Sequence, residues 1–477
     1  MNKIKIFLIS LTALALFIAG CSLEAPTEKQ SVLKPGKANL ARYVALGNSI
    51  TAGFQSAALT EKHQVFSFPN LLAKQMGVTT FQQPLLGYPG LGNFSTEGGG
   101  ILELVLLQNP ATGNPVITPA AYASYPDFNP QNPYVSDAVR QYAAPYNNLG
   151  VPGALTYDIM NATSSTTCAA GLAGSPNPMF DVILRNPAFG NTTPAQQAAL
   201  LHPTFITLWI GNNDVLGYAA SGGTSPAAPT PVATFTALYG AILDALTAIP
   251  IDTVSNAQVV VANIPDVTAI PYFTTIPYMV NVPNVGAVAL VIQTGAGIRQ
   301  ATAADMILLP ASSVIGDTTG TYGPHGVPVG LHQLAPLPNS LVLDSDEVTV
   351  AQQAVTDFNT AIMTLAQERE LWVVDIYGIF NSIKENGYST GGQEFSADFI
   401  TGGIFSLDGV HPSDIGNAII ANEFIKVINV QFSASIPPVN IIELSNDTFL
   451  KARTANVQMP GPDAFKSVIM ACGGFVN

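Results

Sequence analysis

Three polar clusters in this sequence hold side chains that could perform acyl transfer together. Ser49 lies in GNSI, Asn213 lies in GNND, and Asp408 and His411 lie three residues apart in DGVHP. A serine hydroxyl is a poor nucleophile at neutral pH, so it needs a neighbouring base to accept its proton. His411 is the candidate base, and Asp408 can hold its imidazole in one tautomer and stabilise the imidazolium. These residue types predict a Ser49–His411–Asp408 triad.

Apolar runs indicate the strands that must position these clusters. The runs are typical of strands buried on both faces of a parallel sheet, and they are YVAL (43–46), TFITLWI (204–210), AQVVVA (257–262) and LWVVD (371–375). Ser49 follows the first run and Asn213 follows the second. Ligand sites of such sheets lie at the carboxyl ends of the strands. We therefore expect the polar clusters to converge on one edge of the sheet.

Two amphipathic helices accompany these strands. Apolar residues recur at three- and four-residue steps from Val348 to Leu365, ahead of the last strand, and DSDE (344–347) begins this helix. A second helix follows HPSD, with Ser413 as its cap and Ile415, Ile419, Phe424 and Ile428 on its buried face. Strands that alternate with helices predict an α/β sandwich.

The ordered blocks GNSI, VPGA (151–154), GNND and DGVHP resemble the conserved blocks of the SGNH/GDSL hydrolases, a family of serine esterases and lipases. The resemblance covers residues 41–60, 143–160, 200–270 and 347–430. It implies a flavodoxin-like three-layer α/β/α sandwich with a mainly parallel five-stranded sheet and large loop insertions. It also implies hydrolysis of carboxylic esters without a metal or an organic cofactor.

The resemblance further assigns the donors that would stabilise an oxyanion: the backbone N–H groups of Ser49 and Gly153 and the side-chain amide of Asn213. One position departs from the family pattern, because Asn48 stands where the usual Gly-Asp-Ser-Leu has aspartate. Asparagine keeps the hydrogen-bonding shape of aspartate and loses its charge. We expect activity to survive this change, with altered electrostatics near the nucleophile.

The N-terminus resembles a bacterial lipoprotein export signal. Two lysines and a short apolar run lead to IAGC, so we expect residues 1–20 to be removed and Cys21 to be lipidated. An ordinary secretory peptide with an incidental cysteine is the alternative. Residues 21–38 are polar with Pro and Gly and are expected to form a tether. The predicted location is the cell envelope, with the lipid anchor in the outer membrane.

The remaining chain is predicted to hold one hydrolase domain, residues 39–432, followed by an extension over residues 433–477. The domain carries insertions near residues 57–142 and 272–345 that are rich in Pro, Gly, Ala and aromatics. Their apolar segments could wall a pocket or form a lid, or they could pack on the core and thicken it. An apolar wall would favour fatty acyl or aryl esters.

The net charge of the chain and its remaining titratable residues bear on binding of nucleic acid, binding of metal ions and disulfide formation. Without residues 1–20 the chain has 15 basic and 31 acidic residues, a net charge of 15 − 31 = −16, which excludes nucleic acid as a partner. The other histidines lack metal-ligand spacing, and Asp214 is interpreted as a brace for the block around Asn213. Cys168 and Cys472 could pair in an oxidising compartment, or each could be a buried structural cysteine.

Two alternatives to an esterase or lipase stay open. A carbohydrate O-acetylesterase would have a short, polar acyl site, and the same family includes such enzymes. A non-catalytic surface-binding lipoprotein would use the fold without the chemistry. Retention of Ser49, Gly153, Asn213, Asp408 and His411 argues against the second alternative, because a binding scaffold has no need of the whole set.

Overall fold

Five parallel strands form the central sheet of the computed structural model, which describes residues 33–92, 100–108, 115–121, 129, 131–224 and 228–444. Their order across the sheet is β13 (Trp372–Val374), β6 (Gln258–Ala262), β5 (Phe205–Trp209), β1 (Tyr43–Gly47) and β4 (Asn148–Gly150). Every residue of β1 and β5 is buried, as expected for central strands covered on both faces. The predicted α/β fold with a five-stranded sheet is confirmed.

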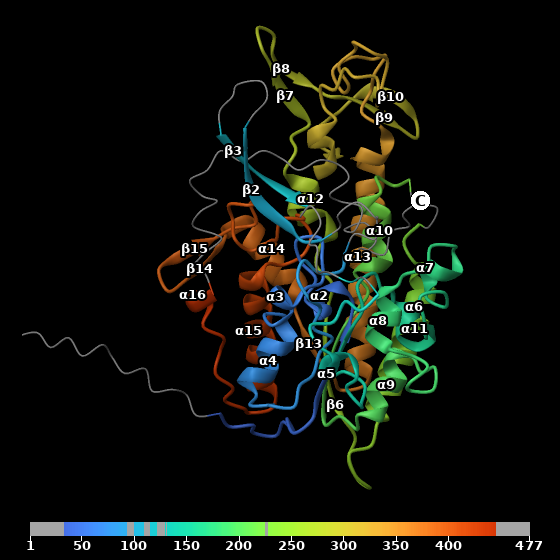
Figure 1. The fold of residues 1–477 in the computed structure, drawn as a ribbon, viewed down its shortest axis with the longest axis vertical. Helices are drawn as coiled ribbons and strands as arrows, with labels where there is room; N and C mark the ends of the chain where they lie inside the picture. The colour runs from blue at the N-terminus through green and yellow to red at the C-terminus, as the bar shows by residue number, and fades with distance from the viewer. Residues whose placement is uncertain are drawn as a thin grey trace, which may run out of the picture. The chain divides into compact units, whose positions relative to one another are not determined.

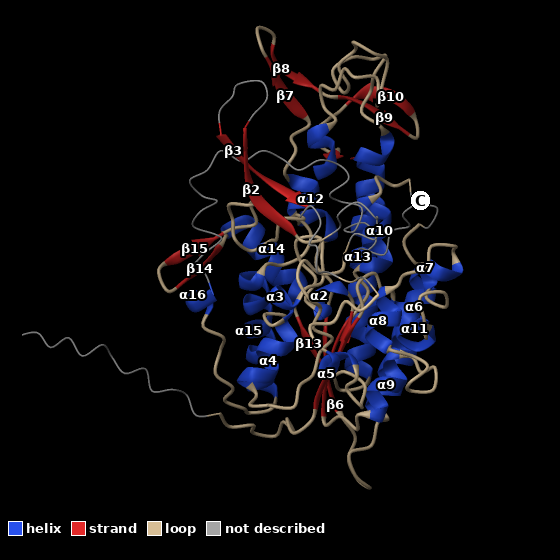
Figure 2. Ribbon diagram, viewed as in Figure 1, coloured by secondary structure: helices blue, strands red, loops and turns tan. Residues whose placement is uncertain are grey.

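Helices cover both faces of this sheet (Figures 1 and 2). On one face, α4 (Phe68–Gln75) packs on α15 (Asp414–Gln431), where the rings of Phe68 and Phe424 stack with centroids 5.0 Å apart. On the other face lie α9 (Pro194–Leu200), α11 (Val232–Thr247) and α13 (Ser345–Glu368). The stacked rings of Phe235 and Phe358 join α11 to α13, with centroids 4.0 Å apart.

The two helices that the sequence predicts are present with their caps. Asp344 caps α13 by accepting hydrogen bonds from the backbone N–H groups of Asp346 and Glu347, and the Glu347 side chain completes a capping box. Ser413 caps α15 by accepting from the Gly416 N–H. The DSDE segment thus begins a helix, as predicted.

The strand order places a topological switch point between β1 and β5. The chain passes from β1 to β4 on one side and then returns to β5 on the other. Crossover connections diverge at such a point, and they leave a crevice at the carboxyl ends of the two strands. Ser49 immediately follows the N-cap after β1, and Asn213 begins α10 (Asn213–Ala220) after β5.

The second predicted insertion builds a small hydrophobic core of its own, separate from that of the sheet. We call residues 276–343 the insertion subdomain. Its core includes Leu290, Ile292, Val314 and Leu337, all buried. Its hairpins are β7 (Met279–Val282) with β8 (Gly286–Ala289) and β9 (Val291–Thr294) with β10 (Gly297–Gln300), followed by β11 (Met306–Ile307), η2 (Leu309–Ser313), η3 (Asn339–Leu341) and β12 (Val342–Leu343).

The remaining elements are short and mostly flank the carboxyl edge of the sheet or its helical layers. They are α2 (Ser49–Ala52), α3 (Glu61–Gln64), β2 (Leu102–Gln108), β3 (Pro115–Ala121), α5 (Asp137–Arg140), α6 (Thr156–Asn161), α7 (Ala169–Leu172), α8 (Met179–Leu184), η1 (Val267–Ala269), α12 (Pro271–Thr274), α14 (Ile376–Asn386), β14 (Tyr388–Thr390), β15 (Gln393–Phe395) and α16 (Ile441–Leu444).

Several sequence predictions fall on residues outside those that the structure describes. Cys21, the export signal, Cys472 and most of the C-terminal extension are among them, and the predicted domain boundaries stay predictions. Within the described ranges, no helix has both the length and the apolar character needed to cross a membrane.

Candidate active site

Ser49 is positioned by a tight connection between β1 and the short helix α2. Asn48 caps this helix, because its Oδ1 accepts a hydrogen bond from the Ile50 N–H at 3.1 Å. The connection needs glycine on both sides: a Cβ on Gly47 would lie 2.4 Å from the Trp209 carbonyl oxygen, and one on Gly150 would lie 2.4 Å from the Ala52 nitrogen. Because these glycines have no Cβ, the turn that carries Ser49 can pack against the ends of β1, β4 and β5.

The three residues of the predicted triad meet at the carboxyl edge of the sheet. Ser49 Oγ lies 2.8 Å from His411 Nε2, and His411 Nδ1 lies 3.0 Å from Asp408 Oδ2. The Phe54 ring packs against the imidazole with centroids 4.8 Å apart. Ser49 is 3% exposed and His411 is 1% exposed, so the chain nearly covers the reacting atoms. Short hydrogen bonds in a covered site give a histidine the geometry to accept a serine proton.

Asp408 is held in place by donors on two segments. Its Oδ1 accepts from the N–H groups of Val410 and His411, and its Oδ2 accepts from the Ala57 N–H at 3.0 Å as well as from the imidazole. Burial raises the pKa of this carboxyl, but the neighbouring His411 and these hydrogen bonds lower it by more, and the net pKa lies below the ordinary value. Asp408 is therefore an anion that orients the imidazole.

The segment after α2 holds the loop that carries Asp408 and His411 through backbone hydrogen bonds. The sequence did not indicate this contact. Ser56 and Ala57 both have positive φ angles, 51° and 67°, which are unfavourable for residues other than glycine. This conformation aims the Ala57 N–H at Asp408 and lets the Ser56 N–H donate to Ser406 Oγ at 2.9 Å. No motif signals such a backbone, so only the structure reveals these positioning residues.

The three predicted oxyanion donors come from segments that meet beside Ser49. Asn213 is 3% exposed, and its Nδ2 donates one hydrogen bond to the Ala154 carbonyl at 2.9 Å, which leaves its second N–H available. Gly153 has a φ of 82°, a left-handed conformation that glycine adopts without strain. Among the described residues, no acceptor is found for the N–H groups of Ser49 and Gly153. The segments can thus supply donors to a developing negative charge.

Asp214 links the Asn213 turn to the Gly153 segment, in agreement with its interpretation as a brace. Its Oδ2 accepts from both the N–H and the hydroxyl of Thr156, each at 2.9 Å, and its Oδ1 accepts from the Thr230 hydroxyl. Burial raises the pKa of Asp214 to about 6, although these hydrogen bonds lower it. The buried Asp158 nearby accepts from the N–H groups of Leu155 and Ala169, and burial raises its pKa to about 7.

His63 and Cys168 both have hydrogen-bond partners within the fold. His63 Nδ1 lies 3.0 Å from Asp414 Oδ1 at the start of α15. Cys168 is buried, and its Sγ caps α7 by accepting from the Gly171 N–H. The Asn48 Nδ2, by contrast, is buried and has no hydrogen-bond partner among the described residues. Within the described residues, no cluster of three or more His, Cys, Asp or Glu side chains is arranged to hold a metal ion.

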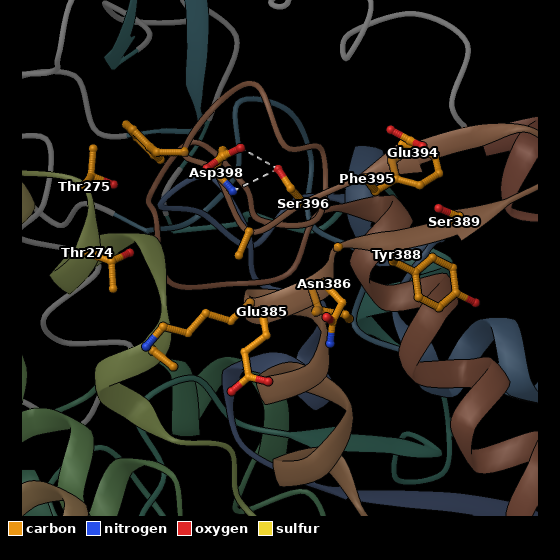
Figure 3. A pocket seen from close by; sticks show the side chains of 16 residues that line it. Thr274, Thr275, Glu385, Asn386, Tyr388, Ser389, Glu394, Phe395, Ser396 and Asp398 are labelled. Atoms are coloured by element: carbon orange, nitrogen blue, oxygen red, sulfur yellow. Dashed lines mark hydrogen bonds between the residues drawn. The ribbon is translucent and has the colours of Figure 1, made fainter.

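A polar cavity of about 760 Å³ lies next to the loop that carries Asp408 and His411. Figure 3 shows the side chains that line this cavity. Hydroxyl, amide and carboxylate groups line it, including Thr274, Asn386, Ser396 and Asp398. The lining residue Phe399 packs beside Gly409, whose carbonyl accepts a hydrogen bond from the Tyr272 N–H at 2.9 Å. Neither Ser49 nor His411 lines this cavity. It is thus a separate hollow that adjoins the catalytic loop.

The fold and the arrangement of serine, histidine and aspartate define an α/β protein of the SGNH hydrolase class. A family model described as GDSL-like lipase/acylhydrolase matches residues 43–424. The chain belongs to this family of ester hydrolases. A search of curated proteins finds no match to the sequence.

Two solved structures are similar to this chain. One is a mutant of an acetyl-xylooligosaccharide esterase from Geobacillus, with 10% identity, 82% of this chain and 95% of that chain covered, and a TM-score of 0.33. The other is a lipase/acylhydrolase from Enterococcus faecalis, with 12% identity, 84% of this chain and 99% of that chain covered, and a TM-score of 0.31.

Proposed function

We propose that the protein hydrolyses carboxylic esters with an apolar acyl or aryl group, through an acyl-enzyme on Ser49. The observation that carries this proposal is the hydrogen-bonded chain from Ser49 Oγ to His411 Nε2 at 2.8 Å and from His411 Nδ1 to Asp408 Oδ2 at 3.0 Å. Membership of the GDSL-like lipase/acylhydrolase family supports the same reaction class. No cofactor enters the proposed mechanism.

In the first half of the reaction, Ser49 Oγ attacks the ester carbonyl carbon while His411 Nε2 takes its proton. The tetrahedral oxyanion accepts hydrogen bonds from the Ser49 and Gly153 N–H groups and from the second N–H of Asn213. Protonated His411, stabilised by Asp408, then gives the proton to the leaving alcohol. The C–O bond to that alcohol breaks, and the acyl group stays on Ser49.

In the second half, His411 takes a proton from water, and the resulting hydroxide attacks the acyl carbon. The same donors stabilise the second oxyanion. His411 returns the proton to Ser49 Oγ as the acyl–oxygen bond breaks, which releases the carboxylic acid and restores the serine. Water must therefore reach a site whose serine is only 3% exposed.

Hydrolysis of p-nitrophenyl esters from acetyl to palmitoyl tests this proposal. The protein used is residues 22–477, with Ser49→Ala as its matched control. Turnover by the parent and none by the variant would support the serine mechanism, and a maximum at medium or long chains would support the apolar substrate. Equal, negligible rates in both proteins across the series would contradict ester hydrolysis.

A carbohydrate O-acetylesterase is the second candidate, and the polar cavity beside the catalytic loop favours it. Its hydroxyl, amide and carboxylate groups are of the kinds that hydrogen-bond sugar hydroxyls. This candidate predicts rates that fall steeply beyond acetyl in the ester series. It also predicts release of acetate from an acetylated oligosaccharide, which an esterase selective for long acyl chains would cleave poorly.

We also propose that the mature protein is attached to the bacterial outer membrane through lipidated Cys21. The IAGC sequence after a short apolar run supports this assignment. Expression of the full chain with labelled palmitate, beside a Cys21→Ala variant, tests it. Label in the parent membrane fraction and none in the variant would support the anchor, whereas an unlabelled parent would contradict it.

A further inference from the structure

The β7–β8 hairpin is an isolated, uncharged and exposed two-stranded ribbon. Val280 pairs with Val288 and Val282 pairs with Gly286, and among the described strands β7 and β8 pair only with each other. At its turn Val285 is 70% exposed, although water is an unfavourable environment for a branched apolar side chain. Figure 1 shows the hairpin projecting at the end of the molecule that also carries β9 and β10.

The whole insertion subdomain is almost free of charge. Only Arg299, Asp305 and Asp317 are charged in residues 276–343, in a chain where 10% of all residues are charged. Arg299 and Asp305 neutralise each other through hydrogen bonds of 2.6 and 2.7 Å. Asp317, which is partly exposed, is thus the one charge in this subdomain without an ionic partner among the described residues, while the complete chain carries a net charge of −14. This face can approach an uncharged surface without desolvating ions.

The exposed large apolar side chains of the insertion subdomain are spread over several segments. Met279 lies on the same hairpin as Val285 and is 37% exposed, and Tyr322 lies in a loop and is 40% exposed. Val285 lies at the turn of β7–β8, Ile298 lies on β10 and is 50% exposed, and Leu334 lies in a loop and is 68% exposed. A rigid protein partner would need a matching depression for each of these tips. A fluid lipid surface accepts scattered tips, because its headgroups and acyl chains rearrange around them.

The topology puts the insertion subdomain on the catalytic edge of the sheet. It follows the carboxyl end of β6, and Ser49 and Asn213 follow the carboxyl ends of β1 and β5. Its base touches the catalytic loop, since a Cβ on Gly409 would lie 2.8 Å from Leu309 Cδ2. A surface that met the hairpin would therefore lie on the side of the sheet where the ester must enter.

We infer that the insertion subdomain docks the protein on a neutral or zwitterionic lipid surface, with Val285 and Ile298 entering that surface. This inference deepens the proposed ester hydrolysis and rests on it for the identity of the substrate, which would be presented by the same surface. Anionic lipid is disfavoured, because the chain without residues 1–20 has a net charge of 15 − 31 = −16 and is repelled by it.

Flotation with phosphatidylcholine vesicles tests the inference, using residues 22–477 so that no acyl anchor contributes. We expect the parent to float with the vesicles, and Val285→Asp to reduce its partition coefficient about tenfold because one apolar side chain no longer enters the lipid. Val254→Asp is the matched control. Val254 is 91% exposed and precedes β6, at the opposite edge of the sheet. The control should float like the parent, and phosphatidylglycerol vesicles should bind the parent less.

Parallel measurements separate this inference from the proposed function. Val285→Asp and the parent should hydrolyse soluble p-nitrophenyl acetate equally, which also shows that the variant is folded, and Ser49→Ala should float like the parent. Flotation without any hydrolysis would sink the proposed function and keep the docking surface. The docking inference would be overturned if the parent protein remained in the buffer fraction and did not float with the vesicles. It would also be overturned if the parent sedimented as a dimer and Val285→Asp dissociated that dimer.

Discussion

Two substitutions of Asp214 distinguish the effect of its hydrogen bonds from the effect of its charge. Asp214→Asn removes only the charge, whereas Asp214→Ala removes the hydrogen bonds as well. In Asp214→Asn, the amide oxygen can take both hydrogen bonds from Thr156, and the amide nitrogen can donate to the Thr230 hydroxyl, which now acts as acceptor. In Asp214→Ala, the buried donors of Thr156 lose their partner. Each unsatisfied buried donor costs about 1–3 kcal/mol. The Asn213 turn and the Gly153 segment would then no longer be linked through Asp214. We expect turnover to fall about 100-fold, because the oxyanion donors would be misplaced.

The pKa of Asp214 predicts how the free energy of unfolding responds to pH. Burial raises this pKa from 3.8 to about 6, so the folded protein holds the proton more tightly than the unfolded chain does. The stabilisation from this group is fully present below pH 3.8 and is lost as pH rises through about 6. One pKa unit corresponds to about 1.4 kcal/mol, so the complete loss is about 3 kcal/mol, and about half of it falls between pH 5 and 8.

Urea unfolding of the parent and Asp214→Asn at several pH values from 5 to 8 measures this loss. We expect the free energy of unfolding of the variant, relative to the parent, to increase by about 1.4 kcal/mol across the range. Asp252→Asn is the control. Asp252 is exposed and its pKa is lowered by hydrogen bonds, so the corresponding difference should not change from pH 5 to 8. A flat or falling difference for Asp214→Asn would refute the argument that burial dominates at this carboxyl.

Three further substitutions test the proposed machinery by steady-state hydrolysis of a soluble ester. Asp408→Asn should lower kcat about 10⁴-fold with KM little changed, because the amide stabilises the wrong imidazole tautomer; a loss below tenfold would contradict its orienting role. Asn213→Ala should lower kcat about 100-fold through loss of one oxyanion donor, and an unchanged kcat would remove it from the oxyanion site. Gly150→Ala should lower both Tm and kcat, because the new Cβ would lie 2.4 Å from the Ala52 nitrogen. Gly295→Ala, which has open space at its Cβ, should match the parent in both, and equal losses in the two glycine variants would contradict the steric argument.

Much of the sheet was predictable because its strands are continuous apolar runs. The runs at 204–210 and 257–262 contain the observed β5 and β6 within one residue at each end. The fifth strand, β4, could not be located from the residues, because it is three residues long and reads NLG. Its position beside β1 is set by pairing with that strand, and its sequence has no apolar pattern of its own.

The reacting residues were predictable from their types and spacing, whereas the parts that hold them were not. Asp408 and His411 lie three residues apart, so their contact is nearly local and the motif carries it. The hydrogen bonds from Ser56 and Ala57 depend on left-handed backbone at residues that are not glycine, which no sequence pattern indicates. The separate core of residues 276–343 was equally hidden, because its apolar residues come from short hairpins and loops without a helical or strand period.

Covalent labelling with a fluorophosphonate tests the central claim most directly. The reagent reports an activated serine, because attack by Oγ on phosphorus expels fluoride and leaves a stable adduct. We predict that peptide mass spectrometry of labelled residues 22–477 will place the adduct on Ser49, and that His411→Ala will label far more slowly because the base 2.8 Å from Oγ is gone. An unlabelled Ser49 in a protein that still hydrolyses esters, or equal labelling rates in parent and His411→Ala, would contradict the account.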